Sequence, residues 1–180
     1  MGFSWYVKHT GEQLMVKKIL VPIVFSKYSS GILSYAAEIA SATGAELIVA
    51  NVINERDLEA VSKITSYGYK VDVEHYIETV KKERLEELGV LLEKLTLPDE
   101  QVTYTFCLGE PTQELLKLVV DRNVDMVVMG VKNRDFRHIF TGSVAERMFH
   151  KCPVTLVSYR GGEVGDRLRR RFEKQRSKEE

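Results

Sequence analysis

The stretch with the clearest chemical potential in this chain combines two glycines, a serine and several basic side chains. It begins at Gly130, directly after an apolar run, and reaches Gly142-Ser143 where a helix is expected to start at Val144. Glycine lets a phosphate approach the backbone, and the first N–H groups of a helix are unpaired donors at the positive end of the helix dipole. The loop between the glycines carries the cations Lys132, Arg134 and Arg137. This pattern predicts a cradle for an anion.

A structural interpretation of the same residues is also open. Ser143 and Glu146 have the spacing of a capping box, which stabilises the start of a helix without any ligand. Surface loops are commonly charged, so the basic residues are equally compatible with a solvated loop. The local sequence therefore leaves an anion site and a plain helix cap as alternatives.

The composition describes an ordinary globular protein. Its 180 residues suit one domain with short appendages, and 44% of them are apolar while 29% are charged. The formal net charge is zero, which gives the whole molecule no electrostatic pull toward nucleic acid or an anionic membrane. We therefore expect neither a membrane nor a nucleic acid as a partner.

The cysteines and the apolar runs bear on the cellular compartment. Cys107 and Cys152 lie far apart and form no C-x-x-C motif, which fits a reducing environment. No apolar run reaches membrane-spanning length, and the first residues lack the apolar core of a signal peptide. These features predict a cytoplasmic protein.

Apolar runs rich in β-branched residues alternate with helical patterns along the chain. Continuous apolar runs are typical of strands buried on both faces, and spacing near 3.6 residues is typical of helices. The expected strands are Ile19–Phe25, Glu46–Ile53, Val102–Leu108, Val124–Met129 and Val154–Tyr159. The expected helices run from a cap at Ser29 or Ser30 to Gly44, over Glu74–Leu97, from Pro111 through Val120, and over Val144–Lys151. Residues 54–73 suggest only a loop with some helical start.

This alternation predicts an α/β fold with a five-stranded parallel sheet sandwiched by helices. In open sheets of this type, ligands bind beyond the carboxyl ends of the strands, at a topological switch point. That rule places Val24–Ser26, Val52–Asn54 and Gly130–Asn133 along one edge. We expect the functional site at this edge.

Two segments flank the predicted core. Residues 1–14 contain aromatic side chains without a sustained period, and we treat them as an N-terminal extension. Gly161-Gly162 follows the last strand and opens a charged tail, residues 161–180, in which Val164, Leu168 and Phe172 are the few apolar positions. Its interleaved acids favour a plain solvated segment, and contact with nucleic acid or an acidic protein is the alternative.

Four pieces of the core, taken in order, resemble the universal stress protein family. They are Lys17–Ser26, Asn51–Arg56, Leu108–Pro111, and Met129–Asn133 with Gly142–Val144, closing on Cys152–Val157. The resemblance spans roughly residues 15–160, and the common order of the motifs makes it specific. It implies a Rossmann-like sheet of the adenine nucleotide alpha hydrolase type and a homodimer formed through the last strand, Val154–Tyr159.

The nucleotide-binding branch of the family also implies a set of ligand contacts. By this resemblance the chain would bind ATP, with Mg²⁺, between the first-strand turn, the end of the second strand and the glycine loop. Pro22, Ile23, Val24 and Val52 would line the adenosine pocket, Gly130, Asn133, Gly142, Ser143 and Val144 would hold the phosphates, and Ser26, Met129 and Val131 complete the set.

The chain departs from the family pattern at two places. The family has Asp where this chain has Val24, and valine cannot accept a hydrogen bond from a ribose hydroxyl, a loss of about 1 kcal/mol. The phosphate loop has the form Gly-x2-Asn-x8-Gly-Ser, with Asn133 in place of the middle glycine. Asparagine tolerates a left-handed backbone turn, so this second change is compatible with the loop.

The sequence contains no recognisable catalytic constellation. Ser26 and Ser143 lie in no Gly-x-Ser-x-Gly turn, and the histidines have no metal-ligand spacing. We expect no metal site in the protein itself and at most slow ATP hydrolysis. Two functions stay open, a nucleotide-binding regulatory module and a ligand-free dimeric signalling or scaffold protein.

Overall fold

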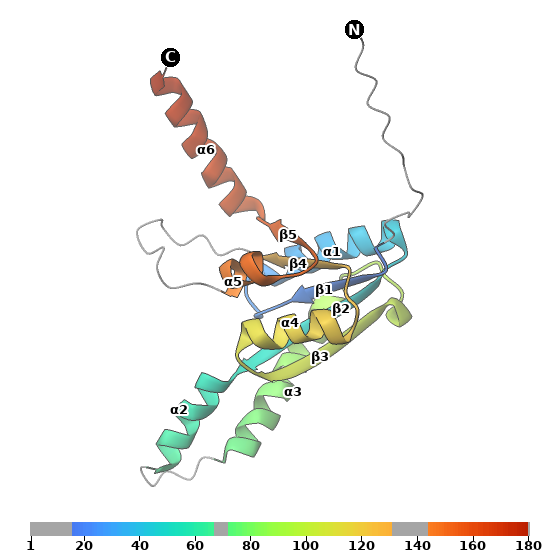
Figure 1. Cartoon of the computed structure of the whole chain (residues 1–180), viewed down its shortest axis with the longest axis vertical. Coiled ribbons are helices and arrows are strands. Elements are labelled where there is room, and N and C mark those ends of the chain that lie inside the picture. Colours follow the sequence, from blue (N-terminus) through green and yellow to red (C-terminus); the bar gives the residue numbers. More distant parts are fainter. Residues whose placement is uncertain (1–15, 67–71, 131–143, 180) are drawn as a thin grey trace.

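The computed structural model describes residues 16–66, 72–130 and 144–179. Within these residues the chain forms five strands, six α-helices and one short 3₁₀ helix (Figure 1). The strands are β1 (Lys18–Pro22), β2 (Glu46–Asn54), β3 (Val102–Gly109), β4 (Met126–Gly130) and β5 (Thr155–Tyr159). The helices are α1 (Ser29–Thr43), α2 (Glu55–Ser66), α3 (Val73–Leu92), η1 (Asp99–Gln101), α4 (Pro111–Asp121), α5 (Val144–Lys151) and α6 (Gly162–Glu179).

The strands form one parallel sheet in the order β3-β2-β1-β4-β5. The predicted five-stranded parallel α/β fold is therefore confirmed. In the register, Ile19 of β1 lies opposite Leu47 of β2 on one side and Met126 of β4 on the other. β1 is the central strand, which explains why its fully buried residues Ile19, Leu20 and Val21 are all apolar.

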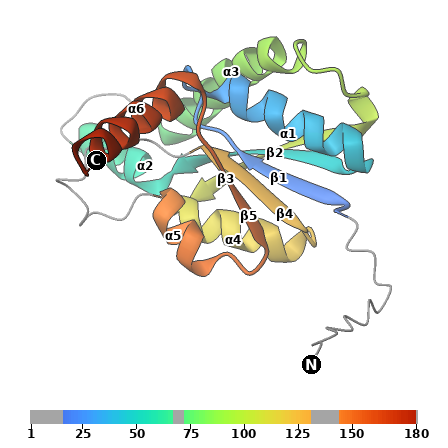
Figure 2. The same cartoon turned by 90° about the horizontal axis from the view of Figure 1, so that it is seen from above.

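Helices cover both faces of the sheet, with α1 and α3 on one face and α4 and α5 on the other (Figure 2). Successive β1 side chains serve opposite faces, because strand side chains alternate. Ile19 and Val21 pack with α1 in one core, and Leu20 packs with α4 and α5 in the other. All three side chains are fully buried.

The end of β1 differs from the sequence-based prediction. The strand ends at Pro22 and not at Phe25, and the backbone at Phe25 has φ 46°, a left-handed conformation that is incompatible with a continuing strand. Neither predicted serine caps α1. Its N-cap residue is Tyr28 without a side-chain hydrogen bond, and the Ser29 hydroxyl instead accepts from the Ser26 N–H over 2.9 Å.

Two helices also differ from the prediction. Residues 55–66, which gave no clear prediction, form α2, whose first turn is supported by the Asn54 side chain accepting from the Arg56 N–H over 3.1 Å. Helix α3 ends at Leu92 and not at Leu97, since the following turn lets Leu95 and Leu97 pack against the first core. The predicted caps are confirmed at Gly44, with φ 70°, and at Pro111 in the first turn of α4.

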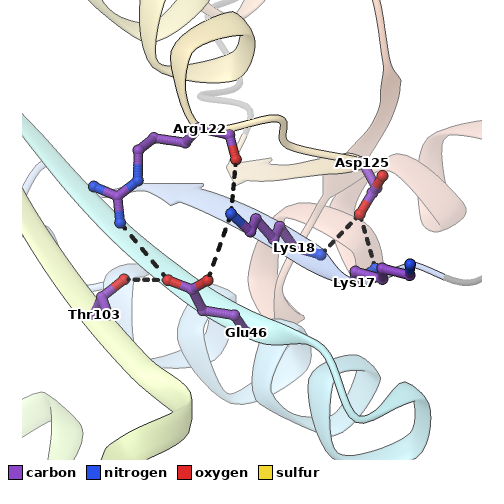
Figure 3. Close-up of polar contacts among 6 residues, drawn as sticks. All are labelled: Lys17, Lys18, Glu46, Thr103, Arg122 and Asp125. Carbon is purple, nitrogen blue, oxygen red and sulfur yellow. Dashed lines mark hydrogen bonds and ion pairs between the residues drawn. The ribbon is translucent and has the colours of Figure 1, made fainter.

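A polar network lies at the amino ends of the strands (Figure 3). Glu46 accepts a hydrogen bond of 2.9 Å from the Thr103 hydroxyl and lies 3.7 Å from the Arg122 guanidinium. Lys18 Nζ donates to the Arg122 carbonyl over 3.0 Å and lies 4.0 Å from the Glu46 carboxylate. These contacts join β1, β2, β3 and the end of α4 at the edge opposite the expected site.

Asp125 completes this amino edge. One of its carboxylate oxygens accepts from the backbone N–H groups of Lys17 and Lys18, over 2.8 and 2.9 Å (Figure 3). These groups precede or begin β1, so Asp125 satisfies donors that the strand ladder leaves unpaired. The network therefore supports the start of the central strand.

Candidate functional site

The switch point of the sheet lies between β1 and β4. The chain leaves β1 through α1 on one face, and it leaves β4 toward α5 on the other face. The residues at this point are Ile23–Ser26, which follow β1, and Gly130, which ends β4. Parallel α/β sheets bind ligands at this location. The structure thus brings the predicted segment after β1 close to Gly130, the described residue of the predicted segment after β4, and Val52 lies on the adjacent strand β2.

Hydrogen bonds hold the loop after β1 in place. The Ile23 N–H donates to the Ala50 carbonyl over 2.9 Å, and the Ile23 carbonyl accepts from the Asn51 side chain over 2.8 Å. Beyond these contacts the Val24 side chain is 67% exposed, and Phe25 has its positive φ. The loop therefore leaves the sheet from a fixed point and presents Val24 to solvent.

Asn51 and Arg84 are positioning residues that the sequence analysis missed. Asn51 is only 5% exposed, and its side-chain oxygen accepts from the guanidinium of Arg84 on α3. A buried amide is stable only when its donors and acceptors are paired, so the contact with Arg84 completes its environment. The one signal in the sequence is an amide side chain inside the otherwise apolar run Leu47–Ile53.

The side chains of the predicted adenosine pocket point in different directions. Val24 is the most exposed of them, while Ile23 is 3% exposed and belongs to the core beneath α1. Pro22 and Val52 are half-buried, and Val52 packs against the core beneath α4 and α5. The Ile23 N–H and carbonyl are already paired with Ala50 and Asn51, and Val24 offers a ligand a side chain without polar groups.

Gly130 lies where two elements approach closely. A Cβ atom at this position would lie 2.5 Å from Cδ1 of Ile32 on α1, so a larger residue would have to displace this methyl group and the packing of α1 favours glycine. The preceding Met129 is 5% exposed and packs in the core beneath α4 and α5. Gly130 therefore leaves the end of β4 without a side chain, which is compatible with a ligand and is also explained by packing.

The remaining predicted phosphate contacts lie mostly outside the described residues. This holds for Val131, Asn133, Gly142 and Ser143, for the loop cations and for the capping box. Val144 is described: it begins α5 and is partly buried against the second core. The predicted helix over Val144–Lys151 is confirmed.

A side-chain cluster joins α5 to α4 at the carboxyl end of β3. Arg147 donates to the Thr112 hydroxyl over 2.7 Å and to the Glu110 carboxylate over 2.8 Å. Glu110 is also the N-cap of α4, where it accepts from the Gln113 N–H over 2.9 Å. The cluster fixes the first turns of both helices relative to one another, and with them the position at which α5 begins.

The charge of Glu110 follows from these contacts. Burial acts to raise its pKa, but the backbone N–H groups of Gln113 and Thr112, the Thr112 hydroxyl and the positive charge of Arg147 together hold the pKa below its ordinary value. The carboxylate is therefore ionised at neutral pH and fully engaged. It is a structural group and not a free base for catalysis.

Other candidate chemistry is weak in the described part of the chain. Burial, followed by the nearby charge of Glu114, raises the pKa of the Cys107 thiol, which disfavours the reactive thiolate. The residues that the structure describes contain no group of three or more His, Cys, Asp or Glu side chains able to hold a metal ion. Nor do they include a helix long and apolar enough to cross a membrane.

The fold places the protein among the open parallel α/β proteins. The sequence profile of the universal stress protein family matches residues 15–160, and the chain belongs to this family. The universal stress protein MJ0577 of Methanocaldococcus jannaschii is 27% identical over 155 residues, which cover 80% of this chain and 96% of the relative.

Solved structures show the same fold. A structure of MJ0577 superposes with a TM-score of 0.62 at 24% identity, covering 82% of this chain and 99% of that one. A universal stress protein from Archaeoglobus fulgidus in complex with dAMP gives a TM-score of 0.55 at 19% identity, covering 81% and 99% of the two chains. A universal stress protein in complex with cAMP gives 0.53 at 17% identity, covering 81% and 97%.

Proposed function

We propose that this protein is a regulatory module that binds an adenine nucleotide, ATP by preference, at the carboxyl edge between β1 and β4. The observation that carries the proposal is the loop Ile23–Ser26, which leaves the central strand at the switch point and is held there by buried Asn51. Two family members of the same fold have been solved with dAMP and with cAMP, which supports an adenine nucleotide as the ligand class.

The proposal assigns the two ends of the nucleotide to different segments. The adenosine would lie against Pro22–Val24 and Val52, and the phosphates would lie against Gly130 and the N-terminus of α5, with Val131, Asn133, Gly142 and Ser143 completing the cradle. The absent side chain of Gly130 and the helix start at Val144 fit a phosphate. Because the described residues offer no carboxylate cluster, Mg²⁺ would be held mainly by phosphate oxygens.

We also propose a homodimer formed through β5. This strand is the last in the sheet order, next to β4, and Thr155 and Ser158 are exposed on it. An edge strand has backbone donors and acceptors that a second copy could pair. The dimer would belong to a cytoplasmic protein whose functional domain is residues 15–160.

Val24 supports a second candidate function, a dimeric signalling or scaffold protein without a nucleotide. Its exposed apolar side chain offers no acceptor for a ribose hydroxyl, and Gly130 is already explained by its contact with Ile32. In that case the dimer surface and the exposed helices would carry the function.

Identification of bound nucleotide separates the two candidates. Freshly purified protein would be denatured, released nucleotide identified by chromatography and mass, and the emptied protein titrated with ATP and Mg²⁺ by calorimetry. About one ATP per chain is the expected result. The absence of released nucleotide together with a flat titration would reject nucleotide binding and leave the scaffold function.

A further inference from the structure

Helix α6 lies outside the residues that match the family and stands away from the sheet (Figure 1). It follows β5 through Gly161, and Gly162 has φ 22°. An ion pair of 2.8 Å between Lys27 and Glu163 joins its first turn to the loop after β1. From Gly162 to Glu179 the helix is long enough to present a surface of its own.

An apolar stripe runs along α6. Leu168 and Phe172 are four residues apart, so they lie on one face of the helix, and the sequence has Val164 at the same spacing before them. Phe172 is 73% exposed and Leu168 is half-buried, and in the described structure neither of them packs against the two hydrophobic cores. Exposed apolar surface on a helix that leaves the domain body indicates a binding face.

Cations border this stripe on both sides. At 3.6 residues per turn, one row runs along one side of the stripe and a second row along the other. The first row is Arg167, Arg171 and Lys174, and the second is Arg169 and Arg176, all exposed. The acids Asp166 and Glu173 lie on the opposite face. Apart from Arg170, which lies on the face of the acids, and Glu179 at the end of the helix, the charge of α6 is therefore sorted by face, although the whole chain has a net charge of zero.

This charge distribution favours one of three partners that could bind the apolar stripe and its basic borders: a second copy of α6, a nucleic acid or an anionic bilayer. If two copies of α6 packed stripe against stripe, basic rows would face basic rows in either orientation, and like charges would oppose the pair. A nucleic acid would engage the cations but leave the apolar stripe without burial. An anionic bilayer accepts both features, because the apolar stripe enters the headgroup boundary while long basic side chains reach lipid phosphates on either side.

We propose that α6 is an interfacial helix that docks the protein on an anionic lipid bilayer. The stripe of Leu168 and Phe172 enters the headgroup boundary, and the two basic rows lie at the level of the lipid phosphates. Asp166 and Glu173 face water. The proposal departs from the expectation of no membrane partner, and it is independent of the nucleotide site because it concerns a different surface.

Sedimentation of the full chain with vesicles tests this assignment. The protein should sediment with vesicles of equal parts phosphatidylglycerol and phosphatidylcholine and remain in solution with phosphatidylcholine alone. Rising salt should weaken binding, because salt screens the attraction to the anionic surface. The absence of binding to the anionic vesicles at low salt would overturn the proposal.

Matched variants show whether vesicle binding depends on one face of α6 or only on its total positive charge. Phe172→Ser should weaken vesicle binding about tenfold, whereas Phe149→Ser, which removes an equally exposed phenylalanine from α5, should leave it unchanged. Arg167→Gln beside the stripe should weaken binding about fivefold, whereas Arg170→Gln removes the same charge from the face of the acids and should have a smaller effect.

Two further ligands test whether α6 binds a nucleic acid or an acidic protein instead of a bilayer. A short DNA duplex and a polyglutamate chain would be titrated under the same conditions. Equal losses for Arg167→Gln and Arg170→Gln, or tighter binding to either polymer with no effect of Phe172→Ser, would overturn the lipid assignment. Circular dichroism and thermal unfolding of each variant would verify that the core is intact.

Discussion

The Asn51 side chain donates to the backbone carbonyl of Ile23 over 2.8 Å, and this contact fixes the loop at the switch point of the sheet. The same amide accepts from Arg84 on α3. One buried residue therefore connects a surface helix to the backbone that precedes Val24. The contact makes the position of the candidate site sensitive to residues that would not touch a ligand.

Loss of this contact should lower stability and nucleotide affinity together. We expect Asn51→Ala to reduce the free energy of unfolding by about 1–3 kcal/mol, because the Ile23 carbonyl and the Arg84 guanidinium lose their partner. Urea denaturation of Asn51→Ala, Arg84→Ala and the double variant would measure this. The double variant should lose less free energy of unfolding than the sum of the two single variants, because each single change already disrupts the same hydrogen-bond network.

A control separates stability from affinity in this experiment. Asp125→Ala removes an acceptor of two backbone N–H groups at the amino edge of the sheet, so it should lower stability without changing affinity for ATP. Additive costs for Asn51 and Arg84, or an equal loss of affinity in Asp125→Ala, would show that Asn51 does not position the site.

Gly130→Ala should destabilise the fold by about 1 kcal/mol, because the new methyl group would overlap Cδ1 of Ile32. The terminal methyl group of Ile32 can shift slightly, so we expect a loss of stability at the lower end of the range that overpacking of a core causes. Ile32→Val removes that methyl and should recover part of the loss in the double variant. Thermal unfolding of the single and double variants measures both effects.

Gly89 supplies the comparison for Gly130. It lies within α3 with open space around the position of a Cβ, so Gly89→Ala should stabilise the protein by about 0.5–1 kcal/mol through helix propensity. Equal effects of the two substitutions would contradict the close packing of Gly130 against α1.

Much of the fold follows from local sequence patterns. The apolar runs predicted all five strands, because strands buried on both faces consist largely of apolar residues. Gly44 and Pro111 marked helix boundaries, because their residue types favour the backbone conformations found there. The end of β1 was wrong by three residues because Ile23, Val24 and Phe25 are as apolar as the strand itself. Helix α2 was missed because its apolar positions are sparse and most of its surface is polar.

The candidate site was predictable in location but not in its supporting contacts. The switch-point rule located the segments at the ends of β1 and β4 from the order of elements alone. Asn51 and Arg84 are separated by 33 residues, and their contact depends on how α3 packs over the sheet. The link from Arg147 to Glu110 likewise depends on the packing of α5 against α4. Such contacts are tertiary and leave little trace in one sequence.

The contacts of Glu110 should make stability depend on pH. Because its pKa is lowered in the folded protein, its contribution is present above the pKa of the unfolded chain and is lost as the pH falls through the folded pKa. We expect Glu110→Gln to reduce the free energy of unfolding by about 0.5–1 kcal/mol at neutral pH. The difference from the unmodified protein should vanish in acid, where Glu110 is protonated in both states.

Denaturation series from neutral pH to below the ordinary pKa of glutamate would measure this dependence. Glu163→Gln is the control, since the pair with Lys27 is exposed on both sides and its effect should be smaller. A difference between Glu110→Gln and the unmodified protein that persists unchanged in acid would show that the charge of Glu110 is not the stabilising feature.

Val24→Asp provides the sharpest test of the proposed nucleotide site. Val24 is 67% exposed at the switch point, so an aspartate fits there without burying a charge. If the ribose lies against this residue, the new carboxylate accepts a hydroxyl hydrogen bond worth about 1 kcal/mol, and affinity for ATP should rise about fivefold. Val120→Asp, at an equally exposed position on α4, should leave the affinity for ATP unchanged.

Calorimetric titration of Val24→Asp would compare ATP with 2′,3′-dideoxy-ATP, which lacks both ribose hydroxyls and should show no gain in affinity. An unchanged affinity for ATP, or the same gain for both nucleotides, would mean that the ribose does not contact Val24.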